Sequence, residues 1–256
     1  MKEIKLYWSH SKPNFGDAMS PLICERLSGR SVVHASKRTC DLVAVGSLLD
    51  RFKERFFHPR VNVWGTGFIE DGQPRSSRFH YHAVRGRYSV DLVRGQSINT
   101  FGDPGLLADV LWPELRGGKK SHRIGIVPHY KDRGEKMVKD LANSLKSSFI
   151  IDVFGDVTDV LRQIASCDCV LSSSLHGLII ADSFGIPNAR IKLSDKVRGK
   201  DFKFKDYYSI FDLEYLAVAL DPAQINEGVL DHIIQSHDRP GVDLIKDRLI
   251  EAFPFL

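Results

Sequence analysis

Short apolar runs that stop at a glycine and a polar residue recur along the first half of this chain, and they restrict its fold more than any other feature. The runs span residues 41–46, 61–67, 81–86 and 99–105, and another apolar run, 4–8, opens the chain. A helical pattern at 19–27, with Pro21 in its first turn, lies between the early runs. Strands that end in this way are typical of parallel sheets whose functional loops share one edge. The sequence therefore predicts an α/β fold.

The pattern restarts after a polar, glycine-rich segment at 116–121, which is the best candidate for a linker. Beyond it the spacing predicts strands and helices in alternation: strands at 123–127, 149–153, 169–172 and 189–192, and helices at 134–145, 156–165 and 178–184. Two tail helices are predicted at 224–236 and 242–253. We expect two Rossmann-like, doubly wound domains, residues 1–118 and 119–256, that face each other across a cleft. The tail helices are expected to pack back on the first domain.

Composition excludes several classes of protein. The formal net charge of +4 is too small for a nucleic-acid-binding surface. No apolar run reaches the ~20 residues that cross a membrane, and residues 1–8 read as a strand and not as a signal peptide. The four cysteines (Cys24, Cys40, Cys167 and Cys169) lack the spacing of a zinc site and suit buried thiols. We expect a cytoplasmic protein.

The segment 171–177 carries the clearest chemical signal. An apolar run stops at Ser172, Ser173 and Ser174, and His176 follows at the predicted start of a helix. Backbone N–H groups at a helix N-terminus favour an anion, and an imidazole beside an anion is suited to proton transfer. The alternative interpretation is that the serines only cap the helix and the histidine fills space.

Seven motifs then occur together in this chain. They are 14–17 (NFGD), 65–67 (GTG), 84–89 (VRGRYS), 102–107 (GDPGLL), 128–130 (PHY), 172–177 (SSSLHG) and 203–208 (KFKDYY). In their order and types, over residues 4–210, they resemble the polysaccharide pyruvyl transferases, including the succinoglycan-type enzymes. The resemblance implies a fold like that of GT-B glycosyltransferases. It also implies transfer of a pyruvyl group from phosphoenolpyruvate onto a sugar as a cyclic ketal. Many members carry arginine two residues before the histidine, where this chain has Ser174.

The resemblance and the chemistry together suggest roles for the motif residues. Ketal formation needs a general acid, for which His176 is the candidate, and a base near the sugar hydroxyls, for which Asp17 is the candidate. Phosphoenolpyruvate carries a carboxylate and a phosphate, which arginine binds in a bidentate way. The predicted donor-binding residues are Arg85, Arg87, His129, Ser173, Ser174 and Leu175. The predicted acceptor-binding residues are Asn14, Gly16, Asp103, Lys205 and Tyr207.

Structural roles remain open for several of these residues. Asp17 can be a helix cap, Arg85 can pair with a carboxylate, and Asp103 can shape a turn. Lys203 and Lys205 can form a solvated face, and Tyr207 can belong to the core.

The expected partners are phosphoenolpyruvate and a glycan or lipid-linked oligosaccharide, with no nucleic acid. No cofactor and no metal are expected. A lipid-linked acceptor would bring the enzyme to the inner face of the membrane. Two alternatives stay open: a nucleotide-sugar glycosyltransferase of GT-B fold, and a non-catalytic glycan-binding module.

Overall fold

The computed structural model describes residues 3–11, 13–52 and 60–256. It is a mixed α/β structure in which every paired strand is parallel. The α/β class predicted from the sequence is confirmed. The finer prediction of two Rossmann-like domains in a GT-B arrangement stays a prediction, as do the domain limits.

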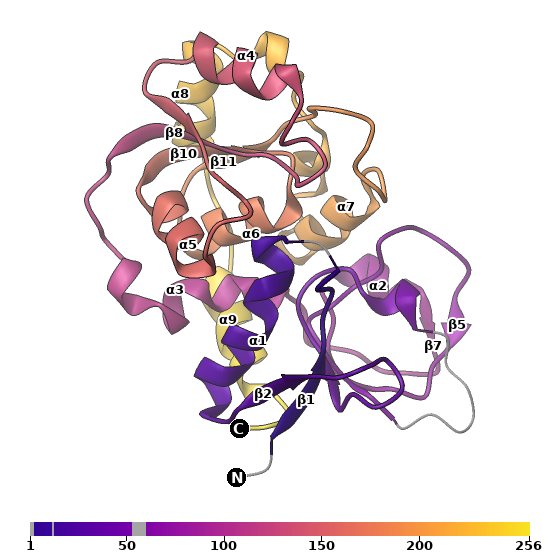
Figure 1. The fold of residues 1–256 in the computed structure, drawn as a ribbon. Helices are drawn as coiled ribbons and strands as arrows, with labels where there is room; N and C mark the ends of the chain where they lie inside the picture. Colours follow the sequence, from indigo (N-terminus) through magenta and orange to yellow (C-terminus); the bar gives the residue numbers. More distant parts are fainter. Residues whose placement is uncertain (1–2, 12, 53–59) are drawn as a thin grey trace.

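Two separate sheets form the frame of the molecule (Figure 1). The first has the order β2-β1-β3-β4-β6, with strands Val32–His34, Ile4–Tyr7, Leu42–Val43, Asn62–Trp64 and His80–Ala83. The second has the order β11-β10-β8-β9, with strands Asn188–Arg190, Cys167–Ser172, His122–Val127 and Ser148–Ile150. A small third sheet pairs β5 (Arg75–Ser76) with β7 (Val93–Arg94).

The helices fill the space between the sheets and cover the second one. In chain order they are α1 (Phe15–Ser28), α2 (Arg87–Asp91), α3 (Ala108–Leu111), α4 (Lys136–Ser144), α5 (Val157–Ala165), α6 (Leu175–Ser183), α7 (Phe202–Tyr208), α8 (Glu227–Ser236) and α9 (Val242–Glu251). Figure 1 shows α1, α5, α6 and α9 between the two sheets, with α4 and α8 on the far side of the second sheet. Because α1 packs on α5, the main core contains residues of both sheets, such as Leu6, Trp64, Val127 and Val170.

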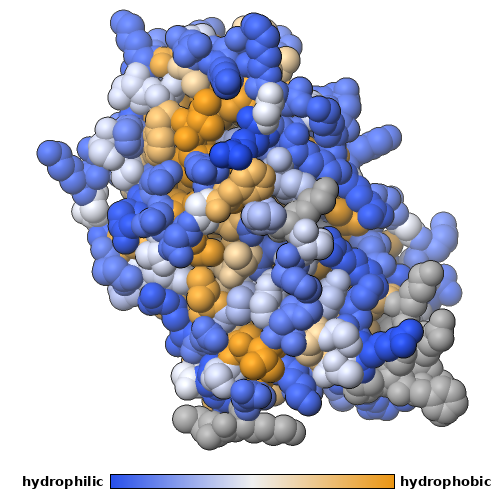
Figure 2. Space-filling model, viewed as in Figure 1, coloured by the Kyte–Doolittle hydropathy of each residue, from blue (hydrophilic) through white to orange (hydrophobic). Residues whose placement is uncertain are grey.

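The tail helices go to different places. The indole N–H of Trp64 in β4 donates to the carbonyl of Leu249 in α9 at 2.8 Å, so α9 packs against the first sheet. Helix α8 instead contacts β10 and β11 of the second sheet. On the outer surface, Figure 2 shows apolar residues gathered between α4 and α5. Ile150, the last residue of the edge strand β9, and Phe154 are exposed.

Some predicted elements differ in extent. Helix α1 begins at Phe15 and not at residue 19, because Asn14 accepts a hydrogen bond from the Gly16 N–H and caps the helix there; Pro21 therefore lies in the second turn. Helix α6 likewise begins at Leu175 and not at 178. The strand expected near residue 101 is reduced to one bridge, because Gly102 has a φ of 129° and Asp103 starts a 3₁₀ turn. Strand β2 and helix α7 were not predicted.

Candidate active site between the two sheets

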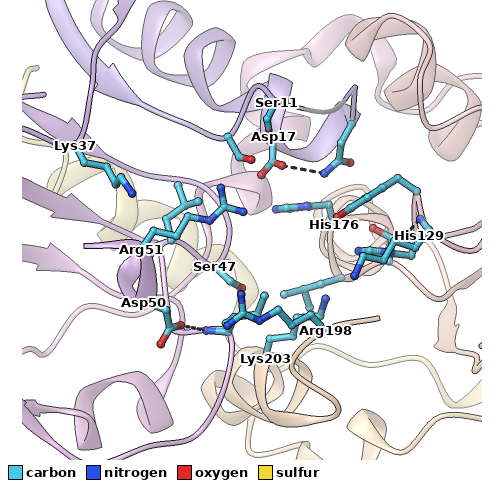
Figure 3. A pocket seen from close by; sticks show the side chains of 18 residues that line it. Ser11, Asp17, Lys37, Ser47, Asp50, Arg51, His129, His176, Arg198 and Lys203 are labelled. Carbon is cyan, nitrogen blue, oxygen red and sulfur yellow. Dashed lines mark hydrogen bonds between the residues drawn. The ribbon is translucent and has the colours of Figure 1, made fainter. Parts of the chain in front are cut away.

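A pocket of about 550 Å³ lies where the carboxyl ends of strands from both sheets meet. One wall comes from the loops after β1 and β3, and the other from the loops after β8 and β10. The first wall includes Ser9, Ser11, Asn14, Asp17, Ser47, Asp50 and Arg51; the second includes His129, Tyr130, Lys131, Ser174, Leu175 and His176, with Lys203 from α7. Figure 3 shows Asp17, Arg51, His176 and Lys203 around this space. Two predicted catalytic residues thus line one pocket.

The start of α1 orients Asp17 on the first wall. Asn14 caps the helix through its side-chain oxygen, and its amide nitrogen donates to Asp17 Oδ2 at 3.1 Å. Burial raises the pKa of the Asp17 carboxyl, while Asn14 and then the cations Arg51 and Lys203 oppose that rise. Asp17 is therefore held in a fixed direction and takes up a proton more readily than an exposed aspartate does.

The start of α6 carries the second wall. The Ser172 hydroxyl bonds backbone groups of the loop, donating to the Val127 carbonyl at 2.8 Å and accepting from the Ser174 N–H at 3.0 Å. Ser174 is the N-cap residue, yet its hydroxyl makes no capping bond. The N–H groups at the first positions of α6 have no acceptor within the helix. This end of α6, together with the Ser174 hydroxyl at the pocket, is suited to an anion.

His176 is enclosed between two glycines of the first wall. A Cβ at Gly16 would lie 2.0 Å from His176 Nδ1, so only glycine lets the imidazole occupy this position. A Cβ at Gly46 would lie 3.6 Å from His176 Nε2 and 3.7 Å from Asp17 Oδ1, which shows how near the two side chains are. His176 Nε2 is buried and has no hydrogen-bond partner among the described residues. Burial, followed by the charges of Lys203 and Arg85, lowers the pKa of His176 to about 3. The imidazole is therefore neutral at pH 7.

Lys203 was left out of the predicted site, although the sequence analysis placed it in the 203–208 motif. Its side chain reaches the pocket and is only 6% exposed, and no hydrogen bond or ion pair found among the described residues involves its ammonium group. Burial, followed by Arg85 and Arg190, lowers its pKa to about 7. The ammonium lies over the ring of Phe204, 5.2 Å from its centroid. A buried cation without an ion pair is costly unless an anion joins it, so this position is suited to a negatively charged ligand.

The lysine that was predicted, Lys205, is exposed on the outer face of α7. Residues two positions apart in a helix point in directions about 200° apart around its axis. Lys203 and Lys205 therefore cannot both face the pocket. Tyr207 was the signal in the sequence that could have identified Lys203. It lies four residues after Lys203 and so on the same helix face, and a tyrosine there indicates the buried side.

His129 extends the second wall beside Lys131. The backbone N–H of His129 donates to Ser173 Oγ at 2.8 Å, and the Ser173 hydroxyl donates to the buried carboxylate of Asp132 at 2.7 Å. His129 Nδ1 accepts from the Lys131 N–H at 3.3 Å, which leaves Nε2 to carry the proton. Burial and the neighbouring Lys203 and Lys131 lower the pKa of His129 to about 3. Ser173 therefore supports His129 and is not itself part of the pocket wall.

Arg85 lies behind the pocket and is fully buried. Its guanidinium forms an ion pair with Asp206 of α7, with Nε and Nη2 at 2.9 and 2.8 Å from the same oxygen, Oδ2. It also donates to Ser47 Oγ and to the carbonyls of Gly46 and Phe68. With these partners the guanidinium has no group directed at a ligand. Its role in this structure is to join the end of β6 to α7.

Asp103 also acts behind the wall. Its carboxylate accepts from the N–H groups of Gly46 at 3.0 Å and Gly105 at 2.9 Å, and burial raises its pKa to about 6. Gly46 has a φ of 96°, a conformation that favours glycine. Asp103 therefore fixes the loop against which His176 packs.

Two other predicted residues lie away from the pocket. Arg87 is half exposed and pairs with Asp212 at 2.7 Å on the surface. Tyr207 is fully buried, and its hydroxyl donates to Asp182 Oδ2 at 2.8 Å. Neither reaches the space beside His176 in this structure.

Two searches of the described part of the chain gave negative results. Residues 3–11, 13–52 and 60–256 contain no group of three or more His, Cys, Asp or Glu side chains arranged to hold a metal ion. Within the same residues, no helix combines the length and the apolar character that a membrane crossing requires.

Comparison with known proteins gives three findings. The profile of the polysaccharide pyruvyl transferase family matches residues 4–195. An uncharacterised protein of Acanthamoeba polyphaga mimivirus is 29% identical over 228 residues, which are 83% of this chain and 76% of that protein. The succinoglycan biosynthesis protein ExoV of Rhizobium meliloti is 26% identical over 216 residues, which are 82% of this chain and 65% of ExoV. The match to ExoV thus spans slightly less than two thirds of the length of ExoV.

Proposed function

Since the chain belongs to the polysaccharide pyruvyl transferase family and is an enzyme of that type, we propose that it moves the pyruvyl group of phosphoenolpyruvate onto two hydroxyls of one glycan sugar. The product is a cyclic ketal, and phosphate is released. The similarity to ExoV supports a role in the biosynthesis of an exopolysaccharide or another surface glycan. The reaction takes place in the cytoplasm, at the inner membrane surface when the acceptor is lipid-linked.

The observation that carries this proposal is the unpaired ammonium of Lys203 beside His176. Phosphoenolpyruvate brings a phosphate and a carboxylate on a small skeleton. Lys203, the start of α6 with Ser174 and Leu175, and His129 form the cradle for these charges. The acceptor sugar lies on the opposite side, against Asn14 and Asp17.

The first step adds one sugar hydroxyl to the donor. The methylene carbon of the enol gains a proton from His176, the hydroxyl oxygen bonds to the neighbouring carbon, and Asp17 takes the hydroxyl proton. The lowered pKa of His176 comes from burial and from the charges of Lys203 and Arg85. A bound donor with up to three negative charges counteracts the effect of Lys203 and Arg85, so the imidazole acquires its proton when the donor arrives.

The second step closes the ring. The bond between the former enol carbon and the phosphate oxygen breaks, and phosphate leaves with the electron pair into the cradle around Lys203. The second hydroxyl adds to the same carbon and loses its proton, which the departing phosphate or the now neutral His176 accepts. One pyruvyl group has then replaced two hydroxyl hydrogens, and one phosphate has been released.

A thermal-shift measurement with matched lysine variants tests the donor site. Phosphoenolpyruvate should raise the melting temperature of the wild type and of Lys205→Met, and should lose this effect in Lys203→Met. Phosphate release should then require a sugar from a panel of galactosides, glucosides and mannosides. Stabilisation by a nucleoside diphosphate and not by phosphoenolpyruvate would instead identify a glycosyltransferase, and a response to glycan alone would identify a binding module.

A further inference from the structure

Three rings cluster beside the pocket without a part in the chemistry described above. Trp8 follows β1, His34 ends the neighbouring edge strand β2, and His10 lies on the loop after β1. The ring centroids of Trp8 and His34 are 4.7 Å apart, and those of His10 and His34 are 4.0 Å apart. We refer to Trp8, His10 and His34 as the β1–β2 shelf.

The shelf is continuous with the pocket. Ser9, between Trp8 and His10, lines the pocket, and so do Ser11 and Lys37. In Figure 3, Lys37 lies across the pocket from His129. The shelf therefore extends the acceptor side of the pocket, away from the cradle around Lys203.

The shelf is accessible from solvent. His10 and His34 are exposed, and Trp8 is half-buried with part of its indole against the main core. The two other tryptophans, Trp64 and Trp112, are both 0% exposed. Lys37 is exposed, its ammonium nitrogen lies 5.9 Å from the Tyr7 ring centroid, and it forms no ion pair or hydrogen bond found among the described residues. Ring faces and N–H donors at the end of a pocket are suited to a sugar, whose C–H faces pack on rings and whose hydroxyls accept hydrogen bonds.

We propose that the β1–β2 shelf binds the sugar unit next to the reacting sugar in the acceptor chain, so that the enzyme selects an oligosaccharide over a single sugar. This inference rests on the proposed function. The acceptor then runs from Asp17 past Ser9 and Ser11 to the edge of the first sheet. The ring faces supply packing, and the imidazole N–H groups with Lys37 donate to hydroxyls.

Fluorescence provides a test that is independent of turnover, because Trp8 is the one tryptophan with an accessible indole. Acrylamide quenching should decrease when the methyl glycoside of a disaccharide is added, and the methyl glycoside of the single reacting sugar should protect less. Trp8→Phe should remove the quenchable fraction of the emission. Equal protection by both glycosides, or none, overturns the proposal.

Kinetics with matched histidine variants complete the test. His34→Ala should raise KM for the disaccharide glycoside about two- to tenfold and leave KM for the monosaccharide glycoside unchanged. His80→Ala, an exposed histidine at the amino end of β6, should change neither constant. Equal changes for both acceptors, or no change, overturn the shelf. Failure of every acceptor to release phosphate from phosphoenolpyruvate contradicts the proposed function instead, while the quenching measurement still reports on the shelf.

Discussion

Lys203 shows how one side chain can tie ligand binding to pH. Burial is the main cause that lowers the pKa of its ammonium to about 7. A phosphate or carboxylate binds the protonated form, whereas deprotonation removes the attraction.

For the donor, kcat/KM should therefore fall more steeply as the pH rises above about 7, since this constant reports the ionisations of the free enzyme and the low pKa of His176 already makes it fall at lower pH. Lys203→Met should lower donor affinity about 10- to 100-fold, the effect of a lost charged hydrogen bond, and should remove the steeper fall above pH 7. Lys205→Met should keep both the affinity and the steeper fall. The pH profile of kcat/KM for the wild type and the two variants checks this prediction. An unchanged fall above pH 7 in Lys203→Met would mean that another group causes it.

Stability changes with pH in the opposite direction to donor binding. Because the pKa of Lys203 is lower in the folded than in the unfolded chain, the unfolded chain binds more protons between about pH 7 and the ordinary lysine value, and stability rises across that window. Lys203→Met should thus leave the unliganded protein at least as stable as the wild type.

His176 should gain a proton when the donor binds. At pH 6 Lys203 already carries its proton, so titration calorimetry in buffers of different ionisation enthalpy should show greater proton uptake by the wild type than by His176→Asn. The donor's own ionisation is common to both. His176→Ala should also lower kcat about 10²- to 10⁴-fold with the fold retained. His237→Ala removes another histidine with a buried, unpartnered ring nitrogen and should retain activity. Equal proton uptake in wild type and His176→Asn would contradict the assignment of His176 as the acid.

The sequence could indicate some of these residues and not others. Asp17 follows β1 and His176 follows β10, so each lies at the carboxyl edge of its own sheet. Their meeting in one pocket was predictable because the sequence analysis expected the two α/β halves to face each other across a cleft. Arg85 looked like a donor-binding residue because its partner Asp206 is 121 residues away in sequence and nothing local announces it. Tyr207 was assigned to the pocket for the same reason: the buried Asp182 that binds it is identified only by the fold.

At the scale of elements, the two candidate catalytic residues, Asp17 and His176, lie in the first turns of α1 and α6. Strands β3, β4 and β6 were predicted because apolar runs that end at glycine mark them, whereas β2, β5 and β7 were not predicted. The helix starts were placed three or four residues late, because Gly16 and Gly177 resemble loop residues. Each glycine instead permits a close approach: Gly16 to the His176 ring, and Gly177 to Ser172 and Val127.

Gly16→Ala tests the fit between α1 and α6. Alanine suits the helix itself, yet its Cβ would lie 2.0 Å from His176 Nδ1 and displace the imidazole. We expect kcat to fall by at least about tenfold, because the candidate catalytic group is misplaced. Circular dichroism should show an unchanged helix content. Gly134→Ala, where no atom lies within 4 Å of the added carbon, is the matched control. A Gly16→Ala enzyme with normal kcat would mean that the ring position is not critical.

Arg85 joins β6 to α7, so its loss should act on folding. Arg85→Met leaves the Asp206 carboxylate buried without its cation, which costs about 3–5 kcal/mol of unfolding free energy. Denaturant titration should show this, whereas Arg87→Met, which removes a surface pair, should change stability by less than about 1 kcal/mol. A stable Arg85→Met protein with a raised donor KM would return Arg85 to the donor-binding role predicted from the sequence.

At the scale of the whole molecule, one core spans both sheets. Leu6 and Trp64 of the first sheet belong to the same cluster as Val127 and Val170 of the second. The sequence predicted two units from the polar segment at 116–121, but the packing of α1 on α5 and of α9 on the first sheet depends on contacts that no local pattern encodes.

Unfolding should therefore occur in one cooperative transition, although chains of this length often unfold in steps. Calorimetry should give a calorimetric enthalpy close to the van 't Hoff enthalpy, and fluorescence and circular dichroism should report the same midpoint. Two resolved transitions would mean that the halves are stable separately.

Helices α1 and α6 both begin at the pocket, so the positive ends of two backbone dipoles remain there at every pH. Their partial charges do not titrate, so under the proposed function they would attract the leaving phosphate as they attract the donor. We therefore predict that added phosphate competes with the donor and slows turnover. The rate of the proposed pyruvyl transfer would then respond to the phosphate level around the enzyme as well as to the supply of donor.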